Sequence, residues 1–283
     1  MTAAGAPLPA SPIPIAPGVE MPQLGYGLYK VPAEDAEHLV GLALAAGYRH
    51  LDGAAFYGNE AGVGRGIRTA LESGLSREDL FVTSKVWNTE QGYDRTLRAF
   101  DRTLDDLGLE QLDLFLIHWP CAERGLFIET YRALERLHSE GRVRAIGVSN
   151  FQIPHLERLL DSTETVPAVN QVELHPWLQQ RDLREFHAEH GITTEAWSPL
   201  ARGRLLDDPA LLGLARDRGV SVAQLVIRWH LQIGNAVIPK ASSAARIAEN
   251  GDVFSFELDA ASMDTLAAMD RGFRSGSHPD EVN

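Results

Sequence analysis

The sequence has one cysteine, Cys121, among its 283 residues. A single cysteine excludes an intrachain disulfide and any metal site built from several thiolates, which fits a reducing compartment. Long apolar runs are also absent, since no stretch approaches the ~20 residues that a membrane-spanning helix needs. The first twenty residues are proline-rich without a basic residue, unlike a secretory signal. We therefore predict a cytoplasmic protein with a disordered or extended tail over residues 1–20.

Positive charge is scarce. The formal net charge of −13 argues against nucleic acid or an anionic membrane as a partner, because both favour dense Lys and Arg. Only three of the 26 basic residues are lysines, namely Lys30, Lys85 and Lys240. Because arginine is used almost everywhere else, a lysine marks a position where a compact ammonium suits a task better than a planar guanidinium. We expect Lys30 to be an ordinary surface residue and the other two to have functions.

Short apolar runs alternate with amphipathic stretches from Leu24 to about Asn250, the pattern of repeated βα units. The eight expected strands are Leu24–Gly27, Tyr48–Asp52, Leu80–Lys85, Leu112–His118, Ala145–Ser149, Val169–Glu173, Ile192–Trp197 and Ala236–Pro239. Eight such repeats predict an α/β fold with a single (β/α)8 TIM barrel over residues 21–283. The segment "GVGRG" at residues 62–66 follows no strand, so we interpret it as part of a helix and not as a dinucleotide-binding loop.

Four titratable residues lie at three successive strand ends, where the chemistry of a barrel is carried out: Asp52, Tyr57, Lys85 and His118. A free tyrosine titrates near ~10, and a nearby ammonium would lower that pKa. A carboxylate would hold the ammonium charged, and His118 could hydrogen-bond a substrate oxygen. The set predicts a proton relay for a carbonyl becoming an alcohol. That reaction also needs a hydride, which implies a nicotinamide cofactor.

Two other functions compete with this interpretation. A barrel metallohydrolase could use imidazoles and a carboxylate around zinc, from His50, Asp52, His118 and His175. That hypothesis leaves Tyr57, Lys85 and Lys240 without a function. A non-catalytic barrel that only binds the cofactor would be expected to lack one of the four relay residues.

Seven motifs, "GYRHLDGAAFYGNE", "TSKVWN", "LDLFLIHWP", "AIGVSNF", "NQVELHP", "AWSPLARG" and "VIPKASSAARIAEN", occur in this order. With them the chain resembles the aldo-keto reductases from about Met21 to Asn283, particularly the bacterial branch that includes 2,5-diketo-gluconate reductases. The resemblance implies that Tyr57 is the general acid, that Lys85 and Asp52 tune it, and that His118 orients the carbonyl. It also implies a monomer without a metal that reduces small aldehydes or ketones, such as diketo sugars or methylglyoxal-like carbonyls.

By the same resemblance, NADPH would lie extended across the barrel mouth. Its nicotinamide carboxamide would contact Ser149, Asn150 and Gln171, with its ring stacked on Trp197. The pyrophosphate would lie under a segment that includes Ser198, Pro199, Leu200 and Gly203. The 2′-phosphate would contact Lys240, Ser242 and Arg246, and the adenine would contact Glu249 and Asn250. The substrate pocket would be lined by Tyr29, Trp87 and Trp119.

The sequence departs from the family pattern at two positions. Ala241 stands where many relatives have a hydroxyl residue after the lysine, which removes one expected contact to the 2′-phosphate. Gly53 stands where relatives commonly have threonine, so a side chain is missing near the expected nicotinamide ring.

Overall fold

The computed structural model describes residues 5, 6, 8 and 12–283. Its main sheet has eight parallel strands in chain order, and a bridge between Leu24 and Val237 joins the first strand region to the last. The strands are β3 (Gly25–Gly27), β4 (His50–Asp52), β5 (Phe81–Val86), β6 (Leu112–Ile117), β7 (Val143–Ser149), β8 (Val169–Glu173), β9 (Thr193–Trp197) and β10 (Ala236–Val237). Each lies within or overlaps one expected strand. The predicted TIM barrel is confirmed.

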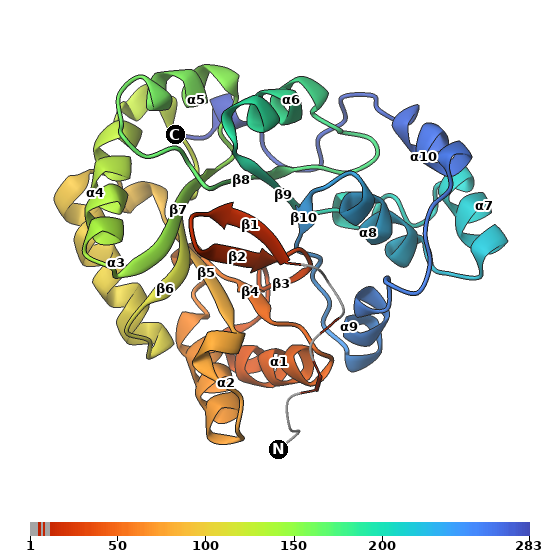
Figure 1. Cartoon of the computed structure of the whole chain (residues 1–283), viewed down its shortest axis with the longest axis horizontal. Helices are drawn as coiled ribbons and strands as arrows, with labels where there is room; N and C mark the ends of the chain where they lie inside the picture. Colours follow the sequence, from red (N-terminus) through yellow and green to blue (C-terminus); the bar gives the residue numbers. More distant parts are fainter. Residues whose placement is uncertain (1–4, 7, 9–11) are drawn as a thin grey trace.

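Helices surround the sheet, as Figure 1 shows. They are α1 (Ala33–Ala45), α2 (Glu60–Glu72), α3 (Tyr93–Leu107), α4 (Phe127–Ser139), α5 (Ile153–Leu160), α6 (Arg181–His190), α7 (Pro209–Arg218), α8 (Val222–Gln232), α9 (Ala244–Gly251) and α10 (Ala260–Ala267). Among the described residues, none of these helices combines the length and apolar character that crossing a bilayer requires.

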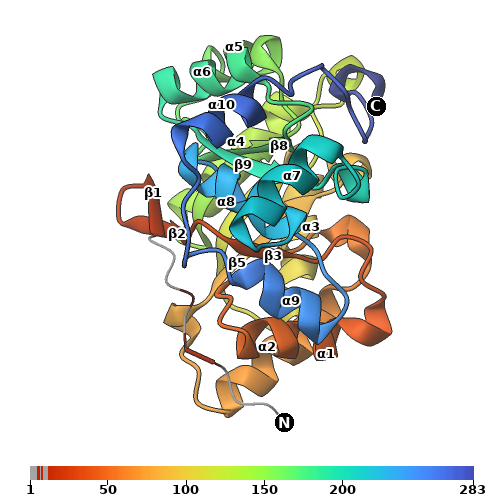
Figure 2. The same ribbon diagram turned by 90° about the vertical axis from the view of Figure 1, so that its right-hand side faces the viewer.

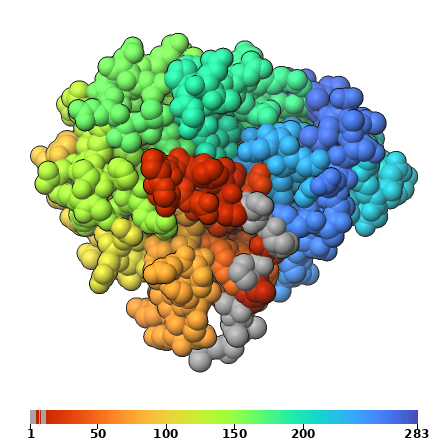
Figure 3. All heavy atoms as spheres, in the orientation of Figure 1, coloured from red at the N-terminus to blue at the C-terminus, as the bar shows by residue number. Residues whose placement is uncertain are grey.

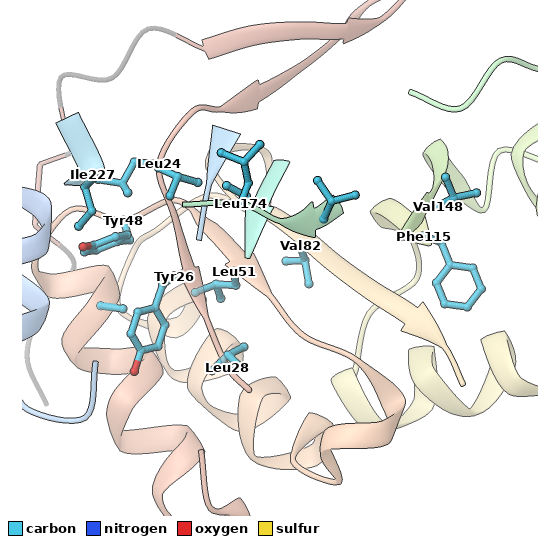
Figure 4. Close-up of a cluster of buried hydrophobic side chains, with 14 of the residues drawn as sticks. Leu24, Tyr26, Leu28, Tyr48, Leu51, Val82, Phe115, Val148, Leu174 and Ile227 are labelled. Atoms are coloured by element: carbon cyan, nitrogen blue, oxygen red, sulfur yellow. The ribbon is translucent and has the colours of Figure 1, made fainter. Parts of the chain in front are cut away.

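Buried apolar side chains fill the space between strands and helices (Figure 4). Two tyrosines in this core, Tyr26 and Tyr48, pack edge to face with ring centroids 5.9 Å apart. The hydroxyl of Tyr26 donates a hydrogen bond to the carbonyl of Ala241 at 2.6 Å, and that of Tyr48 donates one to the carbonyl of Ile247 at 3.1 Å. These two bonds tie the start of the barrel to the segment around α9 at its end, because a buried hydroxyl without a partner would be costly.

The "GVGRG" segment lies inside α2, as expected. A Cβ added at Gly62 would lie 2.7 Å from the carbonyl oxygen of Ala33, and one at Gly64 would lie 2.5 Å from that of Leu107. At Gly66 it would lie 2.8 Å from Cβ of Val40. The glycines therefore permit α2 to pack closely against α1 and the end of α3, and their function is packing.

Residues 12–20 are not disordered, so that alternative of the tail prediction is wrong for them. Strand β1 (Pro12–Ala16) pairs antiparallel with β2 (Val19–Pro22). The hairpin covers one end of the barrel, at the centre of the face in Figure 3 and at the left in Figure 2. Alternation buries Ile15, Val19 and Met21 against the barrel strands, while the prolines are tolerated because an edge strand needs fewer donors. The rest of the predicted tail includes residues 1–4, 7 and 9–11, which lie outside the described residues.

Glu60, the first residue of α2, is buried and accepts hydrogen bonds from Ser84 Oγ at 2.6 Å and Thr103 Oγ1 at 3.3 Å. Burial raises its pKa from 4.5 to about 7, although both hydroxyls lower it. Because folding raises this pKa, the contribution of Glu60 to the free energy of unfolding is fully present below pH 4.5 and is lost as the pH rises to about 7. Glu60→Gln should therefore be more stable than wild type above pH 7, by on the order of 3 kcal/mol. Urea unfolding of both proteins at pH 5 and pH 8 measures this. An equal difference at the two pH values would contradict it.

Candidate active site

The barrel brings Asp52, Lys85 and Tyr57 together at the carboxyl ends of β4 and β5. Lys85 Nζ donates to both carboxylate oxygens of Asp52, at 2.8 and 2.9 Å, and to the carbonyl of Gly53 at 2.8 Å. Its distance to the Tyr57 hydroxyl is 3.5 Å. Lys85 and Asp52 are almost fully buried, at 0% and 1% exposure. The ammonium therefore has one charged partner, and the phenol lies beside it.

The pKa shifts differ in part from the sequence expectation. Burial raises the pKa of Tyr57 to about 12, because it outweighs the lowering effect of Lys85, and Asp52 also raises it. Burial alone would lower the pKa of Lys85, but Asp52 and Tyr57 raise it above its ordinary value. Lys85 does stabilise the phenolate, as expected, yet the net pKa of Tyr57 goes up. Tyr57 is therefore a protonated acid at neutral pH.

His118, which follows β6, lies beside Tyr57 with ring centroids 5.7 Å apart. Burial, and secondarily the charge of Lys85, holds the pKa of His118 well below 6.5, so the imidazole is neutral. Its Nδ1 is buried with no hydrogen-bond partner within the described residues. A neutral imidazole can donate one hydrogen bond to a carbonyl oxygen without competing as a second acid.

An aromatic rim surrounds His118. Trp87 stacks on Phe56 at 3.7 Å between centroids, and Tyr29 packs on Tyr57 at 5.2 Å. Phe56 is 51% exposed and is a pocket candidate that the sequence reasoning missed. The only available signal was its place next to Tyr57. Trp119 follows His118 and is half-buried, and its carbonyl accepts from Gln91 at 2.8 Å.

The residues predicted to contact the nicotinamide carboxamide form one hydrogen-bonded group. Ser149 Oγ donates to the carbonyl of Gln171 at 2.8 Å, and Asn150 Nδ2 donates to Ser149 Oγ and to the carbonyl of His118. Trp197 Nε1 donates to Asn150 Oδ1 at 2.9 Å. Asn150 holds a left-handed backbone with φ of 66°, a strained conformation that is typical of functional sites. The structure thus places these side chains at adjacent strand ends, β7 to β9.

The segment after β9 contains Ser198, Pro199, Leu200 and Gly203, which were predicted to lie at the pyrophosphate. Its backbone is left-handed at Ser198, Ala201 and Arg202, with φ of 48°, 47° and 55°. Three non-glycine residues in this conformation within five positions require support from the surrounding structure. Pro199 and Ala201 are buried there and Leu200 is partly buried, which holds the segment in place.

Two of the three lysines share one pocket. A cavity of about 390 Å³ is lined by Lys30, Pro32, Asp35, His38, Leu39, Lys240 and Ser242. Lys240 Nζ donates to Ser242 Oγ. Ser243 is the N-cap of α9, and its side chain accepts a hydrogen bond from the backbone N–H of Arg246. On this helix Arg246 is exposed, Glu249 is partly exposed and Asn250 is buried. The sequence interpretation of Lys30 as an ordinary surface residue overlooked this pocket, because residues 30 and 240 meet only when the barrel closes.

The C-terminal segment is fixed at the mouth by Glu173, at the end of β8. Its carboxylate accepts from Ser275 N at 2.6 Å and from Gly276 N at 3.0 Å. Burial alone would raise the pKa of Glu173, but hydrogen bonds from His175, Ser275 and Gly276 lower it to about 2. A Cβ on Gly276 would lie 2.6 Å from the Trp197 ring. The segment therefore packs against Trp197 through a backbone that only glycine allows.

The residues of the metallohydrolase hypothesis do not form a metal site. His50 contacts Thr83 Oγ1 at 3.1 Å inside the barrel, and His175 contacts Glu173 Oε1 at 3.1 Å. Over the described residues no group of three or more His, Cys, Asp or Glu side chains is arranged to hold a metal ion.

Comparisons with known proteins agree with this geometry. The Aldo/keto reductase family profile matches residues 21–271. The chain belongs to this family. It is 52% identical over 279 residues to an aldo-keto reductase of Mycobacterium sp. (strain KMS), covering 99% of each chain. It is 50% identical over 266 residues to a glyoxal reductase of Bacillus subtilis (strain 168), covering 94% of this chain and 95% of that protein.

Solved structures are similar over nearly the whole chain. A mutant of the protein Gox0644, crystallised in complex with NADPH, has a TM-score of 0.92 and 46% identity, over 97% of this chain and 99% of its own. An aldo-keto reductase of Bombyx mori in complex with NADP has a TM-score of 0.88 and 32% identity, over 95% of each chain. The family and fold implied by the sequence motifs are therefore confirmed.

Of the two departures of this aldo-keto reductase from the family pattern, Ala241 has a structural explanation and nothing in the structure explains Gly53. A Cβ at Gly53 would lie 3.4 Å from the carbonyl oxygen of Thr83, an ordinary contact, so the backbone does not require glycine there. Ala241 is 5% exposed and packs in the core, while its carbonyl accepts from Tyr26. The single cysteine, Cys121, is fully buried, and burial raises the pKa of its thiol to about 11, so it is not an activated nucleophile.

Proposed function

We propose that this chain reduces small aldehydes and ketones to alcohols with NADPH, and that Tyr57 donates the proton. The observation that carries the proposal is the contact of Lys85 with Asp52 at 2.8 Å and with the Tyr57 hydroxyl at 3.5 Å, beside a neutral His118. NADPH supplies a hydride to the carbonyl carbon when it is bound. His118 orients the carbonyl oxygen, and Tyr57 gives its proton to that oxygen as it becomes a hydroxyl. The four relay residues come from one chain, so the proposed chemistry needs no side chain from a second copy.

Methylglyoxal-like and diketo compounds are the substrate classes that the site favours. The open aromatic rim of Tyr29, Phe56 and Trp87 suits a small molecule with a modest apolar or sugar-like face. The similarity to a glyoxal reductase supports the same class. The test is NADPH oxidation, followed as absorbance at 340 nm, with methylglyoxal, nitrobenzaldehyde and diketo sugars. Binding of NADPH without turnover on any of them would contradict the proposal.

The raised pKa of Tyr57 also predicts different pH dependences for the two directions of the reaction. Reduction needs the neutral phenol, which is the main form at all pH values below its pKa of about 12. Alcohol oxidation needs the phenolate, whose fraction rises about tenfold per pH unit below that pKa. We expect the chemical step of reduction to be nearly flat from pH 6 to 9, while that of oxidation rises steeply. Single-turnover rates in both directions measure this, and a reduction rate that falls with pH across this range would contradict it.

The pocket shared by Lys30 and Lys240 is our proposed site for the 2′-phosphate of NADPH, with Ser242 and Arg246 beside it and Glu249 and Asn250 nearer the adenine. Two of the three lysines of this acidic protein line it together with one carboxylate, Asp35, and two ammonium groups at one pocket suit an anion with two negative charges. Lys240→Ala should raise the KM for NADPH about ten- to a hundredfold, since a hydrogen bond to a charged group is lost. The KM for NADH, which lacks this phosphate, is the internal control and should change little. Equal rises for both cofactors would remove the assignment.

A further inference from the structure

Gln171, on β8, is held by two carboxyl groups. Its side-chain Nε2 donates to Asp52 Oδ1 at 2.7 Å and to Glu195 Oε2 at 2.7 Å. All three residues are buried, with exposed fractions of 2%, 1% and 0% for Gln171, Asp52 and Glu195. Both N–H groups of the amide are therefore used within the barrel. The amide oxygen accepts no hydrogen bond from the described part of the chain.

Chemistry fixes which end of the amide points into the barrel. Asp52 contacts the ammonium of Lys85 through both oxygens, so it is an anion that can only accept. An amide oxygen at 2.7 Å from it would be repelled, whereas an amide nitrogen satisfies it. Glu195 applies the same selection from the other side, through an oxygen that accepts the second N–H. The amide of Gln171 is thus oriented by two acceptors, on β4 and β9.

Glu195 fills this role as a neutral acid. Burial first, and then the charge of Asp52, raises its pKa to about 8, and only one lysine, Lys85, faces the two carboxyl groups. When protonated on Oε1, Glu195 keeps Oε2 as a carbonyl-type acceptor for Gln171. His50 Nε2 lies 3.7 Å from Oε1, and burial lowers the pKa of His50 to about 4, so no second cation is present there.

We propose that Glu195 is a positioning residue for the cofactor: it fixes the amide of Gln171 so that Oε1 accepts a hydrogen bond from the carboxamide N–H of the nicotinamide. This inference rests on the proposed function and on the prediction from the sequence that the nicotinamide carboxamide contacts Gln171. Glu195 is fully buried and would act on the cofactor only through its hydrogen bond with Gln171. The consequence is a preference for cofactors whose ring carries a primary amide.

The probe is a pair of reduced cofactors, NADPH and its 3-acetylpyridine analogue, whose acetyl group has a carbonyl but no N–H. Dissociation constants are measured by quenching of tryptophan fluorescence. The wild type should bind NADPH about five- to tenfold more tightly than the analogue, as expected for one hydrogen bond. Gln171→Leu should abolish this preference. Glu195→Leu should remove most of it, while Glu195→Gln, whose amide oxygen still accepts, should retain it.

The analogue is also the folding control, because its affinity does not depend on the N–H and should be similar in all variants. Glu195→Met replaces Glu195→Leu if the latter does not fold. Full preference in the apolar variants, or its loss in Glu195→Gln, would overturn the positioning role while Gln171→Leu still abolishes the preference. If Gln171→Leu itself changes nothing, the nicotinamide carboxamide does not contact Gln171, and that prediction from the sequence fails instead, while reduction with NADPH stands.

Discussion

Tyr57→Phe is expected to lower the rate of carbonyl reduction by about 10²- to 10⁴-fold, the contribution typical of a positioned general acid. The substitution removes one oxygen and leaves the ring that packs on Tyr29 and His118 at 5.2 and 5.7 Å. Affinity for NADPH should therefore stay close to that of the wild type. The rate is measured by single-turnover absorbance at 340 nm, and binding by fluorescence quenching.

The matched control is Tyr29→Phe. This change removes the same hydroxyl from the neighbouring ring, which is 40% exposed at the rim and, among the described residues, is not a hydrogen-bond partner of Lys85. It should retain most of the activity. Comparable turnover in Tyr57→Phe and wild type would show that the proton comes from another group.

Lys85→Met is expected to have the second large effect, on both activity and stability. The change leaves Asp52 as a buried charge without its cation, a type of loss that costs about 3–5 kcal/mol in the free energy of unfolding. It also removes the ammonium that stabilises the phenolate form of Tyr57 and should lower turnover in the oxidation direction most strongly. Urea unfolding and single-turnover oxidation measure the two effects.

The double variant Asp52→Asn with Lys85→Met separates the two effects. Removing both charges should restore most of the lost stability, because no unpaired charge remains in the barrel. Activity should stay low, since the ammonium is still absent. Recovery of activity in the double variant would mean that Lys85 serves only to neutralise Asp52.

The sequence predicted the barrel, which is confirmed, and it singled out the four candidate relay residues, because both inferences depend on local patterns. Apolar strands that end in polar residues mark the mouth of a barrel. Asp52 is the last residue of β4, Lys85 is the second-to-last residue of β5, and His118 directly follows β6. The sequence failed where the decisive contact is long-range. The prolines of the Pro12–Pro22 hairpin suggested disorder in the sequence. Its apolar residues Ile15 and Met21 find their packing partners only on strands of the barrel that are distant in the sequence.

The same limit explains the site residues that were missed. Lys30 and Lys240 line one pocket only in the closed barrel, and Glu195 reaches Gln171 only because β9 lies beside β8, so the roles we propose for Lys30 and Glu195 depend on long-range contacts. The sequence reasoning correctly assigned the sign of the effect of Lys85 on Tyr57. It could not give the net pKa, because the burial that raises that pKa depends on how the surrounding residues pack.

The central claim is that one hydride from NADPH and one proton from Tyr57 convert a carbonyl to an alcohol. The most direct measurement is a stoichiometric assay in which the loss of absorbance at 340 nm and the alcohol formed from methylglyoxal are quantified in the same reaction. We predict one alcohol formed for each NADPH consumed, with both falling together in Tyr57→Phe. NADPH consumption without alcohol, or alcohol formation that persists in Tyr57→Phe, would contradict it.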